Sequence, residues 1–507
     1  MLIKRMLSLA IAVTMATSLF VGCGKKVEKD TTDAVKTQET KSYKIRFSKS
    51  YHSGLEEAGK AGENIVDNRF TQAYEKDSGI NVTWEFQPKT DGDQKIAMMF
   101  AGGDFPDLIS LTKAQAFKYY VQGVLMPVNE LMDKYTPEYK KITPKEPLDA
   151  VMQDGKYVGF PAIADDYTKA TTAGIIVRRD IMNELGLKDP KTIDEFTALL
   201  KAVKEKKPDM IPLDVRVDTN SIPKLNPIEG AFGVAPLWAV SNGKVVHNAI
   251  QPGYKDYILY VKSLYNQGLI NKEFSLNKDL KANFQSGKAF ATIGGWADTV
   301  SSGMKNTLLA KFPTAKIDFI PYPEGKNGLK GSAQKPPFAN NVICVPVNAK
   351  EKEGGAKFID YCSTEKAGLI QDYGIEGIDY KVQDGKIATS DEQQSKAAWR
   401  VIYTTVSREG SFNRRVGLKG YTEEFNRYTE VCKGNIMPDI QYNFPPIEKV
   451  DSVGGTLAKH QAEFITKVIM GAASINDWDK YVADFNTKGG KDAIAAVNEW
   501  YAKNGKK

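Results

Sequence analysis

The sequence predicts an α/β protein with two lobes, and three observations support this. The chain has 507 residues, whereas a single hydrophobic core stops growing at roughly 250–300 residues. Its composition, 42% hydrophobic and 26% charged, is that of a globular protein rather than a disordered one. Segments with strand periodicity and helix periodicity alternate along the chain, which is typical of sheets covered by helices.

The chain begins with features of an export signal. Two basic residues precede an apolar stretch, residues 6–21, that is short for a membrane span. The stretch ends in Leu19-Phe20-Val21-Gly22-Cys23, which resembles a bacterial lipobox with Phe20 where Leu is usual. We expect residues 1–22 to be removed and Cys23 to carry lipid. The alternative is an ordinary secretory signal in which this cysteine is incidental.

Residues 23–42 are polar and lack large apolar side chains, so we expect a flexible tether. No later stretch approaches 18 consecutive apolar residues, so the remainder is expected to be soluble. The cysteines that follow the tether have no zinc-motif spacing and are predicted to be buried thiols: Cys344, Cys362 and Cys432.

The first half of the chain alternates strands with helices. Tyr43 to Phe47 is predicted to be a strand, and Arg69 to Asp77 a helix. From Ile80 to Phe86 apolar and polar residues alternate strictly, which predicts a half-buried strand with Trp84 in the core. A helix from Lys95 to Phe100 and a strand from Pro106 complete the pattern of a doubly wound lobe.

A second set of units begins near Thr171. Gly174 to Val177 is predicted to be a strand, and Thr192 with Glu195 forms a capping box at a helix start. Another amphipathic helix runs from Tyr257 to Tyr265. From about Ser395 onward the chain is predicted to be mostly helical.

Charge and motif content argue against two classes of function. The net charge is +7, with basic and acidic residues interspersed, so no basic stripe indicates nucleic-acid binding. The three histidines lack metal-ligand spacing, and neither a nucleophile elbow nor a phosphate-binding loop is present. A pair of glycosidase carboxylates is not visible by counting, so a surface glycoside hydrolase stays an alternative.

Several segments, in order, resemble the family-1 extracellular solute-binding proteins of carbohydrate ABC importers, in particular their long Gram-positive lipoprotein members. The segments are Gly102-Gly103-Asp104-Phe105-Pro106-Asp107, Asp154-Gly155-Lys156-Tyr157-Val158-Gly159-Phe160-Pro161, Leu264-Tyr265-Asn266-Gln267-Gly268-Leu269-Ile270-Asn271, Phe284-Gln285-Ser286-Gly287-Lys288-Ala289 and Gly374-Ile375-Glu376-Gly377-Ile378-Asp379-Tyr380. Each segment alone is a weak signal, whereas their shared order is a strong one.

The resemblance implies a periplasmic-binding-protein-like fold of two α/β lobes joined by a hinge, with a helix-rich C-terminal part. It implies crossings near Pro161, Lys335 and Ile378. The expected division is 43–162 with 338–379 in lobe 1, and 163–337 with 380–507 in lobe 2. The segment after Lys206 lacks the oxygen ligands of the calcium loop of some long members, so no metal is expected there, and no cofactor is expected.

Sugar binding needs aromatic platforms and hydrogen-bonding side chains. Trp296 and Asp298 follow an apolar strand and resemble the position that supplies a stacking tryptophan in sugar-binding relatives, although an aromatic of the cleft rim or core is the alternative for Trp296. Glu229 and Phe232 lie in a segment that resembles another ligand loop, although core packing is an equal alternative for Phe232. Tyr51 and Asp166 follow predicted strands, and for both a plain solvated loop is the alternative. Trp238 is expected in the core.

The expected function is capture of an oligosaccharide in an interlobe cleft and its delivery to an ABC import permease, without catalysis. We expect a monomer with no nucleic-acid partner, anchored by lipid to the extracellular face of the cytoplasmic membrane. The alternatives are the same scaffold binding a peptide or a polyamine, and the glycoside hydrolase. Aromatic residues in the cleft favour sugar, whereas a dense ring of acids would favour a polyamine.

Overall fold

A computed structural model describes residues 42–163, 171, 173–218, 220–277, 282–300, 305, 307–334, 338–407 and 422–505. Residues 42–507 form a compact unit of their own. All of the hydrophobic clusters of the described residues belong to this unit. The proposed signal, the tether and Cys23 lie outside the described residues.

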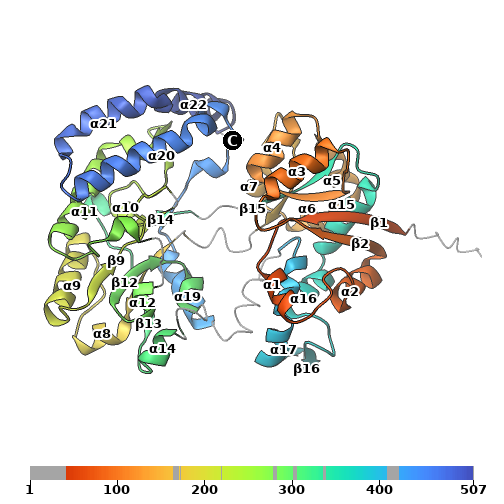
Figure 1. Cartoon of the computed structure of the whole chain (residues 1–507), viewed down its shortest axis with the longest axis horizontal. Coiled ribbons are helices and arrows are strands. Elements are labelled where there is room, and N and C mark those ends of the chain that lie inside the picture. The colour runs from red at the N-terminus through yellow and green to blue at the C-terminus, as the bar shows by residue number, and fades with distance from the viewer. Residues whose placement is uncertain are drawn as a thin grey trace, which may run out of the picture. The chain divides into compact units, whose positions relative to one another are not determined.

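The first lobe is built on a six-stranded sheet in the order β2-β1-β3-β15-β4, with β7 also paired to β15 (Figure 1). β1 pairs in parallel with β2 and β3, whereas β15 is antiparallel to β3, β4 and β7. The strands are β1 (Tyr43–Lys49), β2 (Ile80–Phe86), β3 (Leu108–Thr112), β4 (Leu125–Met126), β7 (Phe160–Ile163) and β15 (Phe338–Pro346). Within this sheet, the parallel arrangement of a doubly wound fold therefore holds only for β2, β1 and β3, the strands nearest the N-terminus.

Helices surround this sheet, and two short hairpins adjoin them. The helices are α1 (Gly54–Lys60), α2 (Arg69–Ser78), α3 (Gly92–Ala101), α4 (Lys113–Val121), α5 (Asn129–Tyr135), α6 (Pro137–Ile142), α7 (Lys145–Asp149), α15 (Lys352–Cys362), α16 (Glu365–Tyr373), α17 (Asp391–Lys396) and η5 (Ala398–Tyr403). The hairpins are β5 (Met152–Gln153) with β6 (Lys156–Tyr157), and β16 (Lys381–Gln383) with β17 (Lys386–Ala388). Trp84 is 3% exposed and stacks on Phe47, as its place in the alternating pattern predicted.

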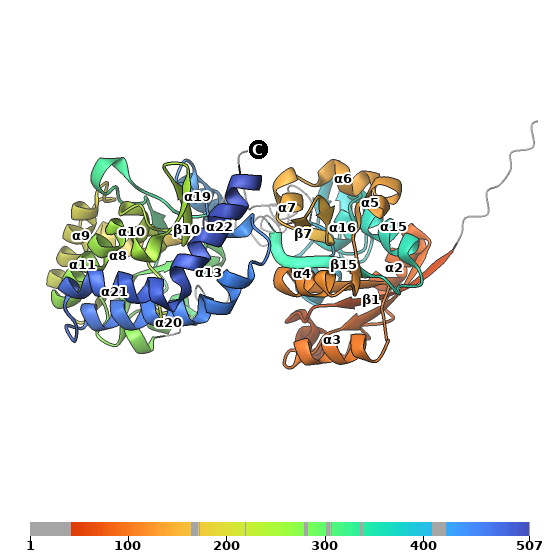
Figure 2. The same cartoon turned by 90° about the horizontal axis from the view of Figure 1, so that it is seen from above.

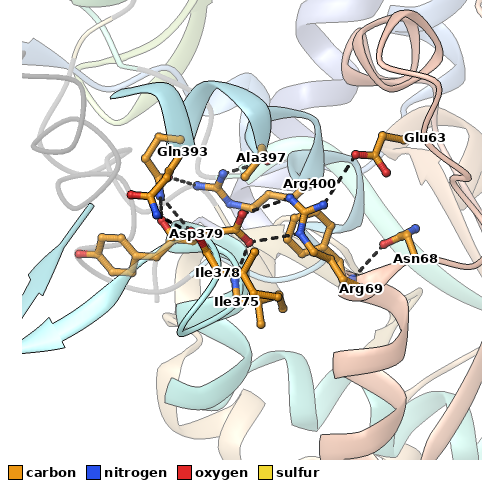
Figure 3. A network of polar contacts seen from close by, with 12 residues as sticks. Glu63, Asn68, Arg69, Ile375, Ile378, Asp379, Gln393, Ala397 and Arg400 are labelled. Atoms are coloured by element: carbon orange, nitrogen blue, oxygen red, sulfur yellow. Dashed lines mark hydrogen bonds and ion pairs between the residues drawn. The ribbon is translucent and has the colours of Figure 1, made fainter. Parts of the chain in front are cut away.

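The segment from residue 380 to 406 corrects the predicted division, which assigned it to lobe 2. Trp399, Ile402 and Tyr403 are buried in the core of the first lobe. A polar network holds this segment in place, because the guanidinium of Arg400 donates to the backbone carbonyl of Asp372 and to the side chain of Gln394. It also donates to the backbone carbonyl of Ala397 at 2.9 Å (Figure 3). The remaining boundaries between the lobes stay a prediction.

The same network ties the start of this segment to α2. The guanidinium of Arg69 pairs with Asp379 at 3.1 Å, and the other oxygen of Asp379 accepts from the backbone N–H of Ile375 (Figure 3). Asp379 is 3% exposed, so its carboxylate is shielded from solvent, whereas the Arg69 side chain is partly exposed. The segment around Ile378 is therefore held against α2 of the first lobe.

The second lobe is built on a four-stranded sheet in the order β13-β8-β12-β9. β12 is parallel to β9 and antiparallel to β8, and β13 is antiparallel to β8. The strands are β8 (Gly174–Arg178), β9 (Ile211–Asp214), β12 (Ala289–Gly294) and β13 (Ile317–Ile320). Every residue of β8 and β12 is buried, and apart from Arg178 and Thr292 both strands are apolar without alternation.

The helices of the second lobe include the long C-terminal ones that the sequence predicted (Figure 1, Figure 2). They are α8 (Arg179–Glu184), α9 (Ile193–Lys206), α10 (Asn226–Ala231), α11 (Pro252–Asn266), α12 (Ala282–Gln285), α13 (Trp296–Val300), α14 (Thr307–Lys311), α19 (Thr422–Cys432), α20 (Glu448–Ile469), α21 (Trp478–Phe485) and α22 (Lys491–Asn504). α20 packs on α11, α21 and α22. Among the described residues, none of the helices has the length and hydropathy of a membrane span.

Short elements complete the second lobe. They are β10 (Trp238–Ser241), β11 (Lys244–His247), β14 (Ser332–Ala333), β18 (Ile436–Met437), and the single turns η1 (Asn248–Ile250), η2 (Phe274–Leu276), η4 (Lys326–Gly328), η6 (Ile440–Tyr442), η7 (Ile475–Asp477) and η8 (Asn486–Gly490). β10 and β11 form a hairpin across Asn242 and Gly243, both of which have positive φ, as a type I′ turn requires.

Two local predictions have mixed outcomes. The hydroxyl of Thr192 caps α9 by accepting from the N–H of Glu195, but the Glu195 carboxylate accepts from the N–H of Lys191 instead of Thr192. The capping box is therefore only half formed. The prediction of buried thiols is confirmed, since the three cysteines of the described residues are buried and free: Cys344, Cys362 and Cys432.

Candidate functional site

A pocket of about 420 Å³ lies in the second lobe. The loop after β9 leads into it, and α10, the hairpin of β10 and β11, η6 and one face of α20 form its walls. The volume is within the range of small-molecule sites. Its lining includes Asp218, Lys224, Asn226, Glu229, Trp238, His247, Asn248, Tyr254, Asp439, Gln441, Tyr442, Leu457 and Gln461.

Close backbone packing holds α10 in place and so positions Glu229. A Cβ added to Gly230 would lie 1.9 Å from the carbonyl oxygen of Gly331, so only glycine permits this approach. Pro227 at the start of α10 supplies a preset helical φ. The helix thus presents the Glu229 carboxyl to the pocket from a backbone that has little freedom.

The Glu229 carboxyl is 8% exposed. Burial raises its pKa to about 8, and the neighbouring Lys224 and Tyr257 oppose this shift only in part. Glu229 is therefore mostly protonated at pH 7 and able to donate as well as to accept a hydrogen bond.

Asp439 is the second buried carboxyl of this pocket, at 5% exposure. Burial raises its pKa to about 6, and backbone N–H groups of Gln441, Leu237 and Trp238 oppose that shift. The carboxylate also accepts from the side-chain amide of Gln441 at 3.1 Å. Asp439 therefore remains mostly ionised at pH 7, with several donors around it.

The aromatic wall of the pocket comes from the hairpin. Trp238 is 4% exposed and packs edge-on against His247, with ring centroids 4.8 Å apart. It therefore lies in the core, as the sequence predicted, and also lines the pocket. Burial lowers the pKa of His247 to about 3, so the ring is neutral. Within the described residues, Nδ1 of His247 is buried and has no hydrogen-bond partner.

A smaller pocket of about 90 Å³ lies in the first lobe, where β1, β3 and β7 end beside η5. The carboxyl ends of strands are where open α/β sheets bind ligands. Its lining is Phe47, Lys49, Ser50, Tyr51, His52, Ser110, Ala162, Asn341, Ile343, Val401, Ile402, Thr404 and Thr405.

Lys49 is the buried charge of the first-lobe pocket. Its ammonium donates to the backbone carbonyl of Thr404 and lies 5.6 Å from the ring centroid of Phe47. Burial lowers the pKa of Lys49 to about 7. The hydroxyl of Thr404 is buried, and the described residues supply no partner for it. Each pocket thus contains a buried polar atom that a ligand hydroxyl could pair with.

The predicted ligand residues are divided between these pockets and the core. Glu229 lines the second-lobe pocket and Tyr51 the first-lobe pocket. Phe232 is partly buried against the rings of Tyr257 and Tyr260, which is the core alternative.

Trp296 and Asp298 line neither pocket. The Trp296 ring packs edge-on against Phe425, with centroids 5.5 Å apart. Asp298 accepts from the N–H of Gly295 at the start of α13. Asp166 lies outside the described residues.

Sequence reasoning missed most of the polar lining of the second-lobe pocket. Asp218 and Lys224 lie in a loop, Asp439 and Gln441 lie about 200 residues later, and Gln461 comes from α20. These residues belong to no shared motif, because tertiary packing alone brings them together. Within the described residues, no cluster of three or more His, Cys, Asp or Glu side chains has the arrangement of a metal site.

Comparisons with known proteins agree on one family. A model of bacterial extracellular solute-binding proteins matches residues 53–369, which is more than half of the chain. The polygalacturonan/rhamnogalacturonan-binding protein YtcQ of Bacillus subtilis is 25% identical over 446 residues, covering 83% of this chain and 85% of that protein. FusA, a fructooligosaccharide ABC transporter substrate-binding protein of Streptococcus pneumoniae, is 25% identical over 401 residues, covering 73% of this chain and 71% of that protein.

Solved structures show the same fold. A solute-binding protein of Bifidobacterium longum infantis, associated with an ABC transporter and described as binding human milk oligosaccharides (HMO), superposes with a TM-score of 0.74 at 16% identity. The alignment covers 90% of this chain and 98% of that one. The fold is therefore the two-lobed α/β fold of solute-binding proteins. Together with the family match, this identifies the chain as a member of the bacterial extracellular solute-binding proteins.

Proposed function

We propose that this protein captures an oligosaccharide between its two lobes and delivers it to an ABC import permease. The observation that carries the proposal is the family match together with a pocket in each lobe that is lined by aromatic and hydrogen-bonding side chains. Relatives named for oligosaccharide or polysaccharide binding, YtcQ and FusA, support the ligand class. Trp238 and Tyr51 would supply apolar surface to sugar rings, and the polar lining would pair with hydroxyls.

Ligand capture would shift the protein between conformations. A ligand that contacts both lobes in only one conformation shifts the population toward it by its differential affinity. The permease would then recognise that conformation. We propose that the protein acts as a monomer and without catalysis, which agrees with relatives that are named as binding proteins.

Anchoring is the second part of the proposal. The resemblance of residues 19–23 to a lipobox supports lipid on Cys23, with the polar segment behind it as a tether at the extracellular face of the membrane. A relative in Bacillus subtilis, 27% identical over 348 residues, is named lipoprotein LipO. A mass increase on Cys23 in the membrane fraction, lost in Cys23→Ala, tests this part.

The six residues predicted from sequence stay proposed ligand contacts: Trp296, Asp298, Phe232, Glu229, Tyr51 and Asp166. The pocket linings support Glu229 and Tyr51 among them. Trp238 joins them because it lines the larger pocket.

A thermal-shift screen tests the function. The chain from Lys25 onward retains the whole compact unit and suits the assay. The probes are kestose, trigalacturonate, milk oligosaccharides and neutral plant oligosaccharides, with peptides and spermidine as other solutes. A ligand at 100 times its dissociation constant adds about 2.7 kcal/mol to the free energy of unfolding.

A stabilising sugar that mass spectrometry recovers unhydrolysed would support binding without catalysis. Stabilisation by peptides or spermidine alone would overturn the carbohydrate assignment, and turnover of the sugar would favour the hydrolase.

A further inference from the structure

The charges that line the second-lobe pocket are paired inside the protein. Among the described residues of the lining, Lys224 is the only Lys or Arg, and its ammonium lies 3.4 Å from a carboxylate oxygen of Asp218. The other oxygen of Asp218 accepts from the backbone N–H groups of Asn220 and Ile222, both at 2.9 Å. The two charges of this pair therefore oppose each other within the protein, and both carboxylate oxygens of Asp218 already have partners.

Asp439 is likewise satisfied by the protein. Its two carboxylate oxygens accept from the backbone and the side chain of Gln441, each at 3.1 Å, and further backbone N–H groups come from Leu237 and Trp238. A carboxylate held by several N–H donors gains little from an added ammonium group, because both partners would lose water. Its negative charge nonetheless remains in the pocket wall and opposes an incoming anion.

Glu229 adds a carboxyl that is largely uncharged at neutral pH because it is buried among α10 and α11 side chains. A neutral carboxyl offers one donor and two acceptor sites to a hydroxyl group. The amides of Gln441 and Gln461 border the same space, and Trp238 supplies an apolar face. This chemistry matches a ring that bears hydroxyls and C–H faces.

We propose that the second-lobe pocket accepts a neutral sugar residue and discriminates against both uronic acids and polyamines. The proposal rests on the proposed function, whose ligand class it narrows. A uronate would bring a carboxylate into a pocket where Lys224, the one cation among the described lining residues, already faces Asp218 and where Asp439 repels the incoming charge. A polyamine would find no carboxylate that lacks partners.

Matched ligand pairs test the proposal by calorimetric titration of the chain from Lys25 onward. The members of a pair differ only at C6: trigalacturonate against the α-1,4-linked galactose trisaccharide, and the corresponding β-1,4-linked glucuronate and glucose trisaccharides. Kestose and spermidine complete the set. We expect neutral sugars to bind about tenfold tighter or more than their acidic counterparts at pH 7, and spermidine not to bind.

A variant and its control test whether the charge of Asp439 causes the difference between acidic and neutral ligands. Asp439→Asn removes the negative charge of this carboxylate and should reduce the difference in affinity between neutral and acidic ligands. Asp479→Asn, on the exposed side of α21, should leave that difference unchanged. The comparison in the unmodified protein stands even if Asp439→Asn fails to fold.

Equal or tighter binding of the acidic member would overturn the inference and leave the proposed function intact. Binding of spermidine alone would overturn both, and so would the absence of binding by every sugar in the set.

Discussion

The pockets of the two lobes bury charges of opposite sign, and burial acts on both in the same way. Glu229 in the second lobe and Lys49 in the first are each less than a tenth exposed. Burial raises the pKa of Glu229 to about 8 and lowers the pKa of Lys49 to about 7. In both cases the low-dielectric environment favours the neutral form. Burial therefore weakens the charge of one lining group in each lobe, an acid in the second lobe and a base in the first.

The pockets also differ in how they are built. The larger pocket is enclosed mainly by packed helices and a hairpin, α10, β10 with β11, and α20, whereas the smaller one lies at the ends of strands of its sheet. Substitutions in the larger pocket should consequently disturb packing more than those in the smaller one. The following substitutions compare how strongly changes in each lobe disturb packing and stability.

Gly230→Ala should have the largest effect, because its Cβ would lie 1.9 Å from a backbone oxygen that has no rotamer to change. Overpacking of this kind costs about 3 kcal/mol or more when backbone must shift. The free energy of unfolding in urea measures this loss. Stabilisation of the protein by a bound ligand should be lost together with the stability of the second lobe.

Gly59→Ala in α1 of the first lobe is the matched control. A Cβ at Gly59 would meet no atom within 4 Å, so alanine should stabilise that helix by about 0.5–1 kcal/mol. Equal destabilisation by the two substitutions would show that close packing of α10 is not what holds the second-lobe pocket.

Glu229→Gln should change the pH dependence of stability. The pKa of Glu229 in the folded protein, about 8, is above its ordinary value of 4.5, so the folded state binds more protons than the unfolded state between these values. Stability contributed by Glu229 is complete below about pH 4.5 and is lost as the pH rises toward 8. The glutamine variant removes this decline, on the order of 1.4 kcal/mol for each pKa unit.

Urea titrations at pH 5 and pH 8 measure this change. The variant should gain stability relative to the parent protein at pH 8 and change little at pH 5. Glu463→Gln on the exposed face of α20 serves as the control, with the same response at both pH values. A parallel pH response of the parent and Glu229→Gln would contradict a buried neutral carboxyl.

In the first lobe, Lys49 should contribute to stability with the opposite pH dependence, and Lys49→Met should remove that contribution. Since the pKa of Lys49 falls from 10.5 to about 7 on folding, the unfolded state binds more protons between pH 7 and 10.5. The contribution of Lys49 to stability therefore rises with pH in this interval. Methionine keeps the length of the side chain without its charge, so the variant should be more stable at pH 7 and lose the rise.

Thermal unfolding at pH 7 and pH 9.5 measures the difference, with Lys60→Met on exposed α1 as the control. A rise in stability that survives in Lys49→Met would assign the pH response to another group.

The fold was predictable where chemistry is local. The alternation from Ile80 to Phe86 predicted β2, and Thr192 with Glu195 predicted the start of α9. The path of residues 380–406 was not predictable from local patterns. Trp399 and Tyr403 join the core of the first lobe through contacts with residues more than 300 positions away, such as Phe70. Periodicity reports which face of an element is apolar and carries no information on which core receives it.

The candidate site was less predictable for a related reason. Glu229 was predicted because its segment resembles a ligand loop of the family, and Tyr51 because it follows a predicted strand; each lines one of the two pockets. Trp296 was predicted from its resemblance to the stacking tryptophan of sugar-binding relatives, and its ring packs on Phe425, which the chain supplies from α19. Aromatic side chains serve cores and ligand platforms alike, so only the partner across the ring separates the two uses.

Substitutions of Tyr51 should have the smallest effect on stability, and they test ligand binding most directly. Its hydroxyl donates to Glu56 at 2.5 Å on the surface, and Lys89 lies 5.6 Å from the ring centroid. Tyr51→Phe removes an exposed hydrogen bond and should change the free energy of unfolding by less than about 1 kcal/mol. Since the apolar ring remains, affinity for a neutral oligosaccharide should stay within about threefold of the parent value.

Tyr51→Ala then separates the ring from its hydroxyl. Removal of an aromatic platform should weaken the same ligand by about tenfold while stability again changes little, because the side chain is half-buried at the rim of its pocket. Titration calorimetry on both variants gives the comparison. Unchanged affinity in Tyr51→Ala would remove the first-lobe pocket from the ligand site and leave the second-lobe pocket to bind the sugar alone.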